Sequence, residues 1–206
     1  MTQPDLPGWL RGSEMGERIF AHDWSESLGP IESWPPHLKL ATNIVLLLPS
    51  PAIVLWGPEF IQIYNDRFRE VMGRKHPNGL GRPVRKSWQE VWDFLAPIYE
   101  GVMTRRESYS FDEQRLVLNR NGVPEECFFR LTYSPLPGAL PDGSSSDDST
   151  PGGVLVTVTE ITEMVRARKR EAERVQLKEA LQASRIELLE KVFRTAPSFL
   201  HVLRGP

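Results

Sequence analysis

The chain has little of the residue chemistry that metal sites, disulfide frameworks and redox centres need. Its 206 residues include one cysteine, Cys127, and four histidines. A single cysteine excludes an internal disulfide framework and is typical of a reducing compartment, so we expect a cytoplasmic protein. His22, His37, His76 and His201 are scattered along the chain, and we therefore predict no metal cluster.

An excess of either charge and a long apolar run are also missing. The 25 basic residues are balanced by 27 acidic ones, which gives a formal net charge of -2. Such a chain lacks the broad basic field of a nucleic-acid-binding protein. The longest apolar stretch, residues 44–56, is broken by Pro49-Ser50-Pro51, and the first residues lack the pattern of a signal peptide. We predict no partnership with nucleic acid or membrane.

Sequence motifs of common enzymes are absent. The chain contains no Gly-x-Ser-x-Gly, no Gly-x-x-x-x-Gly-Lys and no His-Glu-x-x-His. The charged segment at residues 163–194 also lacks the histidine that a self-phosphorylating kinase would need there. We therefore predict that this chain is not itself an enzyme.

Residues 1–50 predict two helices that form an N-terminal cap. Ser13 is a suitable cap for a helix that ends near His22, and Pro35-Pro36 starts a second helix over about 36–48. We expect that second helix to pack on the rest of the protein through Leu40, Ile44, Val45, Leu47 and Leu48.

Residues 51–162 predict an antiparallel sheet with helices between its second and third strands. β-Branched and aromatic runs favour strands at 52–56, 60–64, 109–118, 123–135 and 154–161. Apolar residues at helical spacing favour a long helix over about 87–105, with Ser87 as its cap and a kink at Pro97. The last strand is apolar on both faces, which predicts that the cap helix and a partner subunit cover it.

The last strand runs directly into a charged segment, residues 163–196, that predicts one long helix. From Ile161 to about Thr195 it would extend on the order of 50 Å, longer than a small domain is wide. Heptad spacing suggests a coiled-coil seam, which changes phase once. We expect a dimeric coiled coil, either parallel or antiparallel, and a solvated or docked single helix is the alternative. The predicted seam comprises Ile161, Val165, Ala172, Val175, Leu181 and Leu188.

Two short segments resemble a PAS domain, whose fold is a five-stranded antiparallel sheet with intervening helices. Tyr64-Asn65-Asp66, followed by Phe68 and Gly73, resembles the family after its second strand. Thr159-Glu160-Ile161-Thr162 resembles the Asp-Ile-Thr signature at the family's end, with glutamate in place of aspartate. The resemblance covers residues 51–162 and implies an α+β PAS fold with a helical cap and a C-terminal signalling helix.

Both ends of the chain resemble segments of multidomain bacterial sensors. Gly16-Glu17, His22-Asp23-Trp24-Ser25, Leu28-Gly29-Pro30 and Trp34-Pro35 resemble the extension that precedes PAS modules in sensor histidine kinases. Residues 192–199 resemble the start of another PAS domain, so we expect 197–206 to begin a truncated following domain. These resemblances imply a histidine kinase output, although a cyclic dinucleotide enzyme is equally compatible with the helix.

The resemblance also implies a signalling joint and a ligand cavity. Glu160 and Thr162 stand where strand becomes helix, and an ordinary capping pair is the alternative reading. Aromatic residues and Cys127 on the predicted helix and strands would face the space where PAS domains hold cofactors. That space holds either plain core or a small organic ligand. The predicted cavity residues are Tyr64, Trp88, Trp92, Phe111, Cys127, Phe129 and Tyr133.

The sequence does not identify a cofactor. A LOV-type flavin photosensor needs a cysteine in an Asn-Cys-Arg-Phe context, which is absent, and the helix over 87–105 has no histidine to bind haem iron. We therefore predict a sensory module that forms a homodimer through its C-terminal helix, with the N-terminal cap as a second candidate contact. The alternatives are a constitutive dimerisation scaffold with a filled core and, more weakly, a small enzyme that uses Tyr64 or Asp66.

Overall fold

The structure is a computed structural model that describes residues 6–138 and 151–195. Its contacts divide the chain into two compact units, Met1–Ile161 and Thr162–Pro206. The first, the sheet unit, contains all five strands, and the second, the helix unit, contains one long helix. The predicted loop at 140–152 lies outside the described residues, except for its last two residues, and so does the segment 197–206.

The helices and strands of the sheet unit follow the predicted order. Short 3-10 turns lie at Gly8–Leu10, Ile31–Ser33, Gly73–Lys75 and Gln89–Val91. The helices are α1 (Glu14–Ala21), α2 (Pro36–Leu47), α3 (Phe68–Met72), α4 (Val84–Ser87) and α5 (Trp92–Arg105). The strands are β1 (Ala52–Trp56), β2 (Ile61–Tyr64), β3 (Tyr109–Leu118), β4 (Glu125–Pro137) and β5 (Pro151–Glu160).

The five strands form one antiparallel sheet in the order β2-β1-β5-β4-β3. The last strand, β5, therefore lies at the centre, where Leu155 is opposite Val54 of β1 and Val158 is opposite Leu131 of β4. Helices α3, α4 and α5 connect β2 to β3. This arrangement confirms the predicted α+β PAS fold, with helices before the sheet and a long C-terminal helix.

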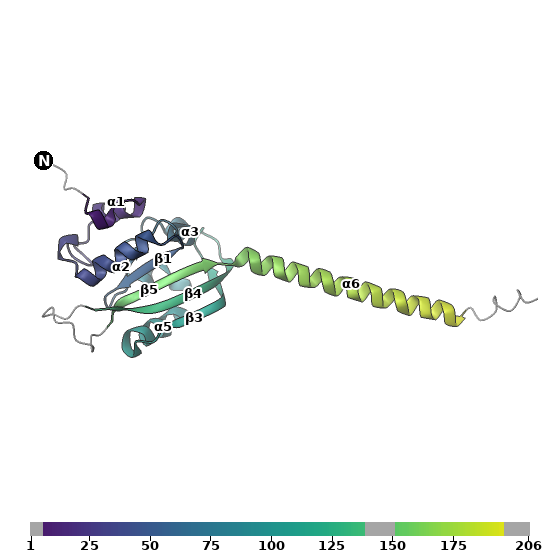
Figure 1. The fold of residues 1–206 in the computed structure, drawn as a ribbon. Coiled ribbons are helices and arrows are strands. Elements are labelled where there is room, and N and C mark those ends of the chain that lie inside the picture. Colours follow the sequence, from purple (N-terminus) through teal and green to yellow (C-terminus); the bar gives the residue numbers. More distant parts are fainter. Residues whose placement is uncertain (1–5, 139–150, 196–206) are drawn as a thin grey trace, which may run out of the picture. The chain divides into compact units, whose positions relative to one another are not determined.

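Helices cover the sheet on both sides, with α2 on one face and α5 on the other (Figure 1). Helix α5 packs on β5 and β4 and buries Leu95, Ile98, Tyr99 and Val102, which lie at the i, i+3, i+4 and i+7 spacing of one helix face. The space between α5 and the sheet is therefore the main core.

The prediction for the packed face of α2 was wrong. The buried residues are Leu38, Ala41, Thr42 and Val45, whereas Leu40, Ile44 and Leu47 are 59%, 46% and 71% exposed. Of the predicted residues only Val45 is fully buried. The helix carries two apolar stripes, and periodicity alone does not distinguish the one that packs on the sheet from the one that remains at the surface.

The start of the central helix also differs from the prediction. Ser87 is the last residue of α4, and α5 begins five residues later, at Trp92, without a side-chain cap. The hydroxyl of Ser87 instead accepts a hydrogen bond from Gln62 Nε2 at 2.8 Å. The other predicted cap is confirmed, since Ser13 Oγ accepts from the Gly16 amide at 2.9 Å.

Asn65 joins the N-terminal helices to the sheet. Its Oδ1 accepts from the Ala52 and Phe68 amides at 3.1 and 3.0 Å. Its Nδ2 donates to the carbonyls of Val45, Leu48 and Ser50 at 3.1, 3.2 and 2.8 Å. One buried side chain thus binds the end of α2, the start of β1 and the start of α3.

The helix unit is the single helix α6, Thr162–Thr195, of 34 residues. Its side chains are mostly exposed, and 15 of the 34 are charged, with acidic and basic residues mixed along its length. No helix among residues 6–138 and 151–195 is long and apolar enough to cross a membrane.

Candidate ligand cavity and signalling joint

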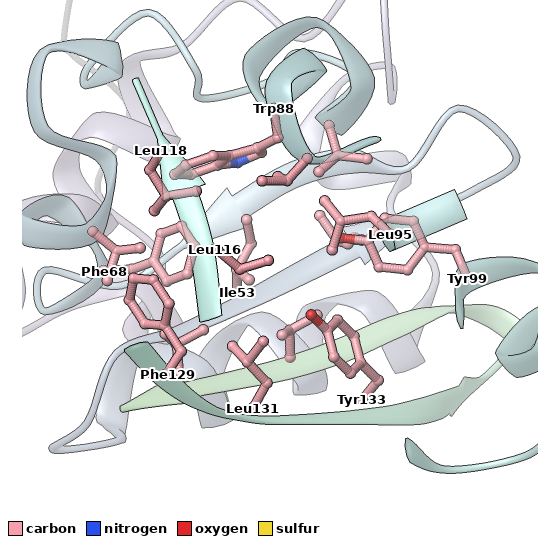
Figure 2. Close-up of a pocket in the computed structure, with 16 residues that line it drawn as sticks. Ile53, Phe68, Trp88, Leu95, Tyr99, Leu116, Leu118, Phe129, Leu131 and Tyr133 are labelled. Carbon is pink, nitrogen blue, oxygen red and sulfur yellow. The ribbon is translucent and has the colours of Figure 1, made fainter. Parts of the chain in front are cut away.

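A cavity of about 60 Å³ lies in the sheet unit, between the sheet and helices α3 to α5 (Figure 2). Its wall is almost wholly apolar. The polar groups in the wall are the phenols of Tyr99 and Tyr133 and the indole of Trp88. The lining residues are Ile53, Leu55, Phe68, Val71, Val84, Trp88, Val91, Leu95, Tyr99, Leu116, Leu118, Phe129, Leu131, Tyr133, Val156 and Val158.

Three of the seven predicted cavity residues, Trp88, Phe129 and Tyr133, line this space. Alternation along β4 places Phe129, Leu131 and Tyr133 on its inner face, as the sequence predicts, because successive side chains of a strand point to opposite sides. The sequence did not single out Tyr99 for the cavity, although Tyr99 belongs to the periodic apolar set of the central helix.

The other four predicted residues lie outside the cavity wall. Tyr64 packs on Phe68, and its hydroxyl bonds His76 Nδ1 at 3.0 Å. Burial raises the pKa of Tyr64 to about 12. Trp92 is only half-buried, beside the guanidinium of Arg85.

Phe111 and Cys127 face the core at the two ends of the β3–β4 pair. Phe111 is half-buried and packs edge-on against Phe94 and Tyr133. Cys127 is buried opposite Leu116, and this burial raises the pKa of its thiol. Strand alternation gives the face on which each residue lies, but not its distance from the cavity along the strand.

Trp88 is held in place by a buried hydrogen-bond network on β2. Its indole N–H donates to Gln62 Oε1 at 3.1 Å, and Gln62 Nε2 donates to Ser87 Oγ and to the Gly79 and Arg82 carbonyls. The ammonium of Lys75 lies 3.9 Å from the centre of the Trp88 ring. Trp88 is therefore a fixed part of the wall. No pattern in the sequence indicated the role of Gln62.

Tyr99 and Tyr133 face each other across one end of the cavity. Their ring centres are 5.9 Å apart in an edge-on arrangement, and the residues are 3% and 2% exposed. Figure 2 shows both hydroxyl oxygens directed toward the cavity. Burial raises both pKa values, and the proximity of Tyr133 raises that of Tyr99 further. Both phenols therefore keep their protons near neutral pH.

The predicted joint residue Glu160 makes its hydrogen bonds within the sheet unit. Arg120, in the β3–β4 turn, donates Nη1 and Nη2 to the two oxygens of Glu160 at 2.7 and 3.0 Å. Its Nε also donates to Glu125 at 3.1 Å, and these hydrogen bonds raise the pKa of Arg120. Glu160 is the last residue of β5, and Thr162, the first residue of α6, is 7% exposed.

Most of the predicted seam lies at the surface of α6. Ala172, Val175, Leu181 and Leu188 are exposed, whereas Ile161 and Val165 are buried. Leu177, Leu181 and Leu188 follow one stripe, and a second stripe on another side of the helix carries Val175, Ile186, Leu189 and Phe193. The exposed apolar residues thus continue beyond the predicted seam toward the helix end.

A second hollow, an open groove of about 1040 Å³, lies beside the β1–β2 hairpin. Its wall carries equal numbers of basic and acidic side chains, so it favours neither an anion nor a cation. They are Arg18, Arg82, Lys86, Asp23, Glu26 and Glu59. Among the described residues no three His, Cys, Asp or Glu side chains are grouped to hold a metal ion. The core cavity, with its almost wholly apolar wall, is therefore the better candidate site.

Solved structures similar to this chain include PAS and LOV domains. A PAS domain from Colwellia psychrerythraea is 14% identical, covers 61% of this chain and 98% of its own, and has a TM-score of 0.43. A sensory box sensor histidine kinase from Vibrio cholerae is 18% identical over 60% of this chain and 88% of its own, with a TM-score of 0.39. The LOV protein of Rhodobacter sphaeroides is 14% identical over 61% and 66%, with a TM-score of 0.44.

No family model and no curated protein matches the sequence. The fold assignment rests on the strand order and on the helices between β2 and β3.

Proposed function

We propose that this chain is a cytoplasmic PAS sensory module that binds a small molecule in its core, dimerises, and passes its conformational state through α6 to an output domain. The observation that carries the proposal is the path of β5. This central strand supplies Val156 and Val158 to the cavity wall, and only Ile161 separates its end from α6. A single strand, β5, therefore connects the cavity wall to the exit helix α6 along the chain.

Exposed apolar surface supports dimerisation with a second copy. Leu177, Leu181 and Leu188 form one apolar stripe on α6, and each is 62% exposed. Leu40 and Leu47 expose a second apolar surface on α2. A coiled coil between two copies of α6 would remove the first surface from water, and a contact between two α2 helices would cover the second.

The output domain of this proposal is a histidine kinase, because the segment before the sheet resembles the extension that precedes PAS modules in such kinases. The chain itself contributes sensing and dimerisation. A ligand shifts the packing of the two α6 helices only to the extent that it binds one packing more tightly than the other.

A constitutive dimerisation scaffold is the second candidate, and the small volume of the cavity favours it. At about 60 Å³ the cavity is less than half the roughly 150 Å³ of an engineered cavity that binds benzene. A scaffold would dimerise in the same way but would not respond to changes in its core.

Sedimentation velocity tests dimerisation. We expect the chain to be a dimer and the Leu181→Lys, Leu188→Lys double variant to be a monomer, because two lysines would be buried in the seam. Gln176→Lys, at a polar position of the same helix, should remain a dimer. Retained near-ultraviolet circular dichroism would show that the variant is folded. A wild-type monomer would contradict the proposal.

Spin-label distance measurement separates the sensor from the scaffold. A label on α6 at position 178, in a Cys127→Ala background, reports the separation of the two helices. Leu95→Phe fills the cavity as a ligand would, and Val123→Phe adds a ring at an exposed turn as the control. A sensor shifts the distance distribution with Leu95→Phe only, whereas an unchanged distribution would favour the scaffold.

A further inference from the structure

The chemistry of the cavity wall restricts the ligand class. No charged side chain lines the cavity. Burial of an unpaired carboxylate or ammonium in such a space would cost many kcal/mol, so a bound molecule is neutral and mostly apolar. Aliphatic side chains from the sheet and from α5 surround it, among them Leu95, Leu131 and Val156.

Two buried hydrogen-bond donors mark one end of this apolar space. Tyr99 and Tyr133 are buried as residues, and no hydrogen bond joins either hydroxyl to another of residues 6–138 and 151–195. Their oxygens are nevertheless open to a water-sized probe, because Thr42 Oγ1 is the only fully buried side-chain oxygen or nitrogen without a partner among these residues. Both residues line the cavity, and both phenols keep their protons. Each therefore has a proton to donate to a molecule inside the cavity.

The volume sets the size of the molecule. A single water needs roughly 10–15 Å³ measured in this way, so a cavity of about 60 Å³ holds on the order of four to six non-hydrogen atoms. A carbonyl oxygen has two lone pairs and accepts from two donors at once, so it matches a pair of phenols.

We propose that the cavity binds a small neutral carbonyl compound, such as a short-chain ketone, whose oxygen accepts hydrogen bonds from Tyr99 and Tyr133. The proposal rests on the proposed sensory role of the cavity and adds a chemical class to it. The apolar body of the ligand lies against Leu95, Leu131 and Val156, and its oxygen lies between the two hydroxyls. Affinity for a molecule of this size is on the order of millimolar.

The test compares butanone with 2-methyl-1-butene, in which a methylene group replaces the carbonyl oxygen. Methyl NMR spectra of the leucine, isoleucine and valine side chains of the purified chain follow binding of each probe. The measured quantity is the affinity for butanone divided by the affinity for the alkene, because in this ratio the apolar contacts that the two probes share cancel. The variants are Tyr99→Phe, Tyr133→Phe and the double variant. Tyr109→Phe is the control, since Tyr109 bonds Arg105 and Glu107 outside the cavity.

Each cavity variant should lower the affinity for butanone relative to the alkene by about three- to tenfold, and the double variant should lower it further than either single variant. Tyr109→Phe should leave the ratio unchanged. An unchanged ratio in the double variant would overturn the proposal, and would be the result if trapped water alone bonds the phenols. The thermal midpoint of the ligand-free variants should not fall, because the deleted hydroxyls have no partner within the protein. A fall of several degrees in both would also contradict the proposal.

Xenon separates failure of this inference from failure of the sensory proposal. If xenon perturbs the methyl groups of Leu95, Leu131 and Val156 but the affinity ratio does not respond to the variants, the cavity is open to ligands and only the carbonyl class is wrong. If neither xenon nor the alkene enters, the core is closed and the proposed sensory function fails with it.

Discussion

Truncation of Asn65 should be among the most damaging single changes in the sheet unit. The side chain makes five hydrogen bonds, two as acceptor and three as donor, to backbone groups of three different segments. Asn65→Ala removes all five without removing much apolar area. The expected effect is therefore a test of hydrogen bonding rather than of packing.

The structure allows the magnitude to be worked out bond by bond. The Phe68 amide also donates to the main-chain carbonyl of Asn65 at 3.2 Å, and the Val45 carbonyl also accepts from the Leu48 amide, so both keep a partner. The buried Ala52 amide loses its acceptor, which costs about 1–3 kcal/mol. The two remaining carbonyl bonds add about 1 kcal/mol each. The total is about 3–5 kcal/mol, a large part of the roughly 5–15 kcal/mol that stabilises a typical domain.

Urea denaturation followed by circular dichroism measures this loss as a fall in the unfolding midpoint. Asn43→Ala is the matched control, because Asn43 makes one such bond, to the Trp9 carbonyl at 2.7 Å, and should cost about 1 kcal/mol. Asn65→Asp keeps both acceptor bonds but turns an oxygen toward three carbonyls, so it should be at least as damaging as alanine. A loss below 1 kcal/mol for Asn65→Ala would refute the reasoning.

Three further predictions concern the joint, the phenols and the wall. Arg120→Gln removes the two hydrogen bonds to Glu160 and should lower the free energy of unfolding by about 1 kcal/mol in urea titrations. The loss should be smaller in high salt, and an equal loss at all salt concentrations would argue against an ionic origin. The folded state raises the pKa values of Tyr99 and Tyr133, so above about pH 10 the two phenols lose protons more readily in the unfolded chain. The free energy of unfolding should therefore be constant below about pH 10 and fall above it, by about 1.4 kcal/mol per pH unit for each phenol. A free energy of unfolding that stays flat from about pH 10 to 11.5 would contradict this. Gln62→Leu leaves the indole N–H of Trp88 without its acceptor and should lower the free energy of unfolding by roughly 2 kcal/mol in the same titrations. A neutral effect would show that the hydrogen-bond network of Gln62 is dispensable.

Most of the secondary structure could be predicted because local signals agree with the fold. The strand 109–118 and the end of α6 at Thr195 match the predicted bounds, and Ser13 caps α1 as expected. Period-2 alternation in β4 gave the correct inner face, since Phe129 and Tyr133 reach the cavity. In each of these places one pattern dominates and no second pattern competes with it.

The predictions failed where two readings of the same residues compete. Helix α2 has apolar stripes on two sides, and the stripe with Leu40 and Leu47 remains exposed. Ser87 is a good cap by type, yet Gln62, which is distant in sequence, uses its hydroxyl. Trp92 and Tyr99 are seven residues apart on nearly the same side of α5, but only Tyr99 lines the cavity. These outcomes depend on long-range neighbours that no local pattern encodes.

The wall of the cavity combines a rigid side with a deformable one. The sheet side includes β5, whose position is fixed by antiparallel ladders to β1 and β4. The helical side includes α3 and α4, of five and four residues, which are too short to be stable helices on their own. Under the proposed sensory function, we therefore expect a ligand that needs more space to displace these short helices before it displaces the strand. Trp88, directly after α4, donates its indole N–H to Gln62 of the edge strand β2. A displacement of α4 would therefore reach the sheet at that edge and cross β1 before it reaches β5. Under the same proposal, we expect the strand that leads into α6 to respond to a change in the twist of the sheet as well as to direct contact with the ligand.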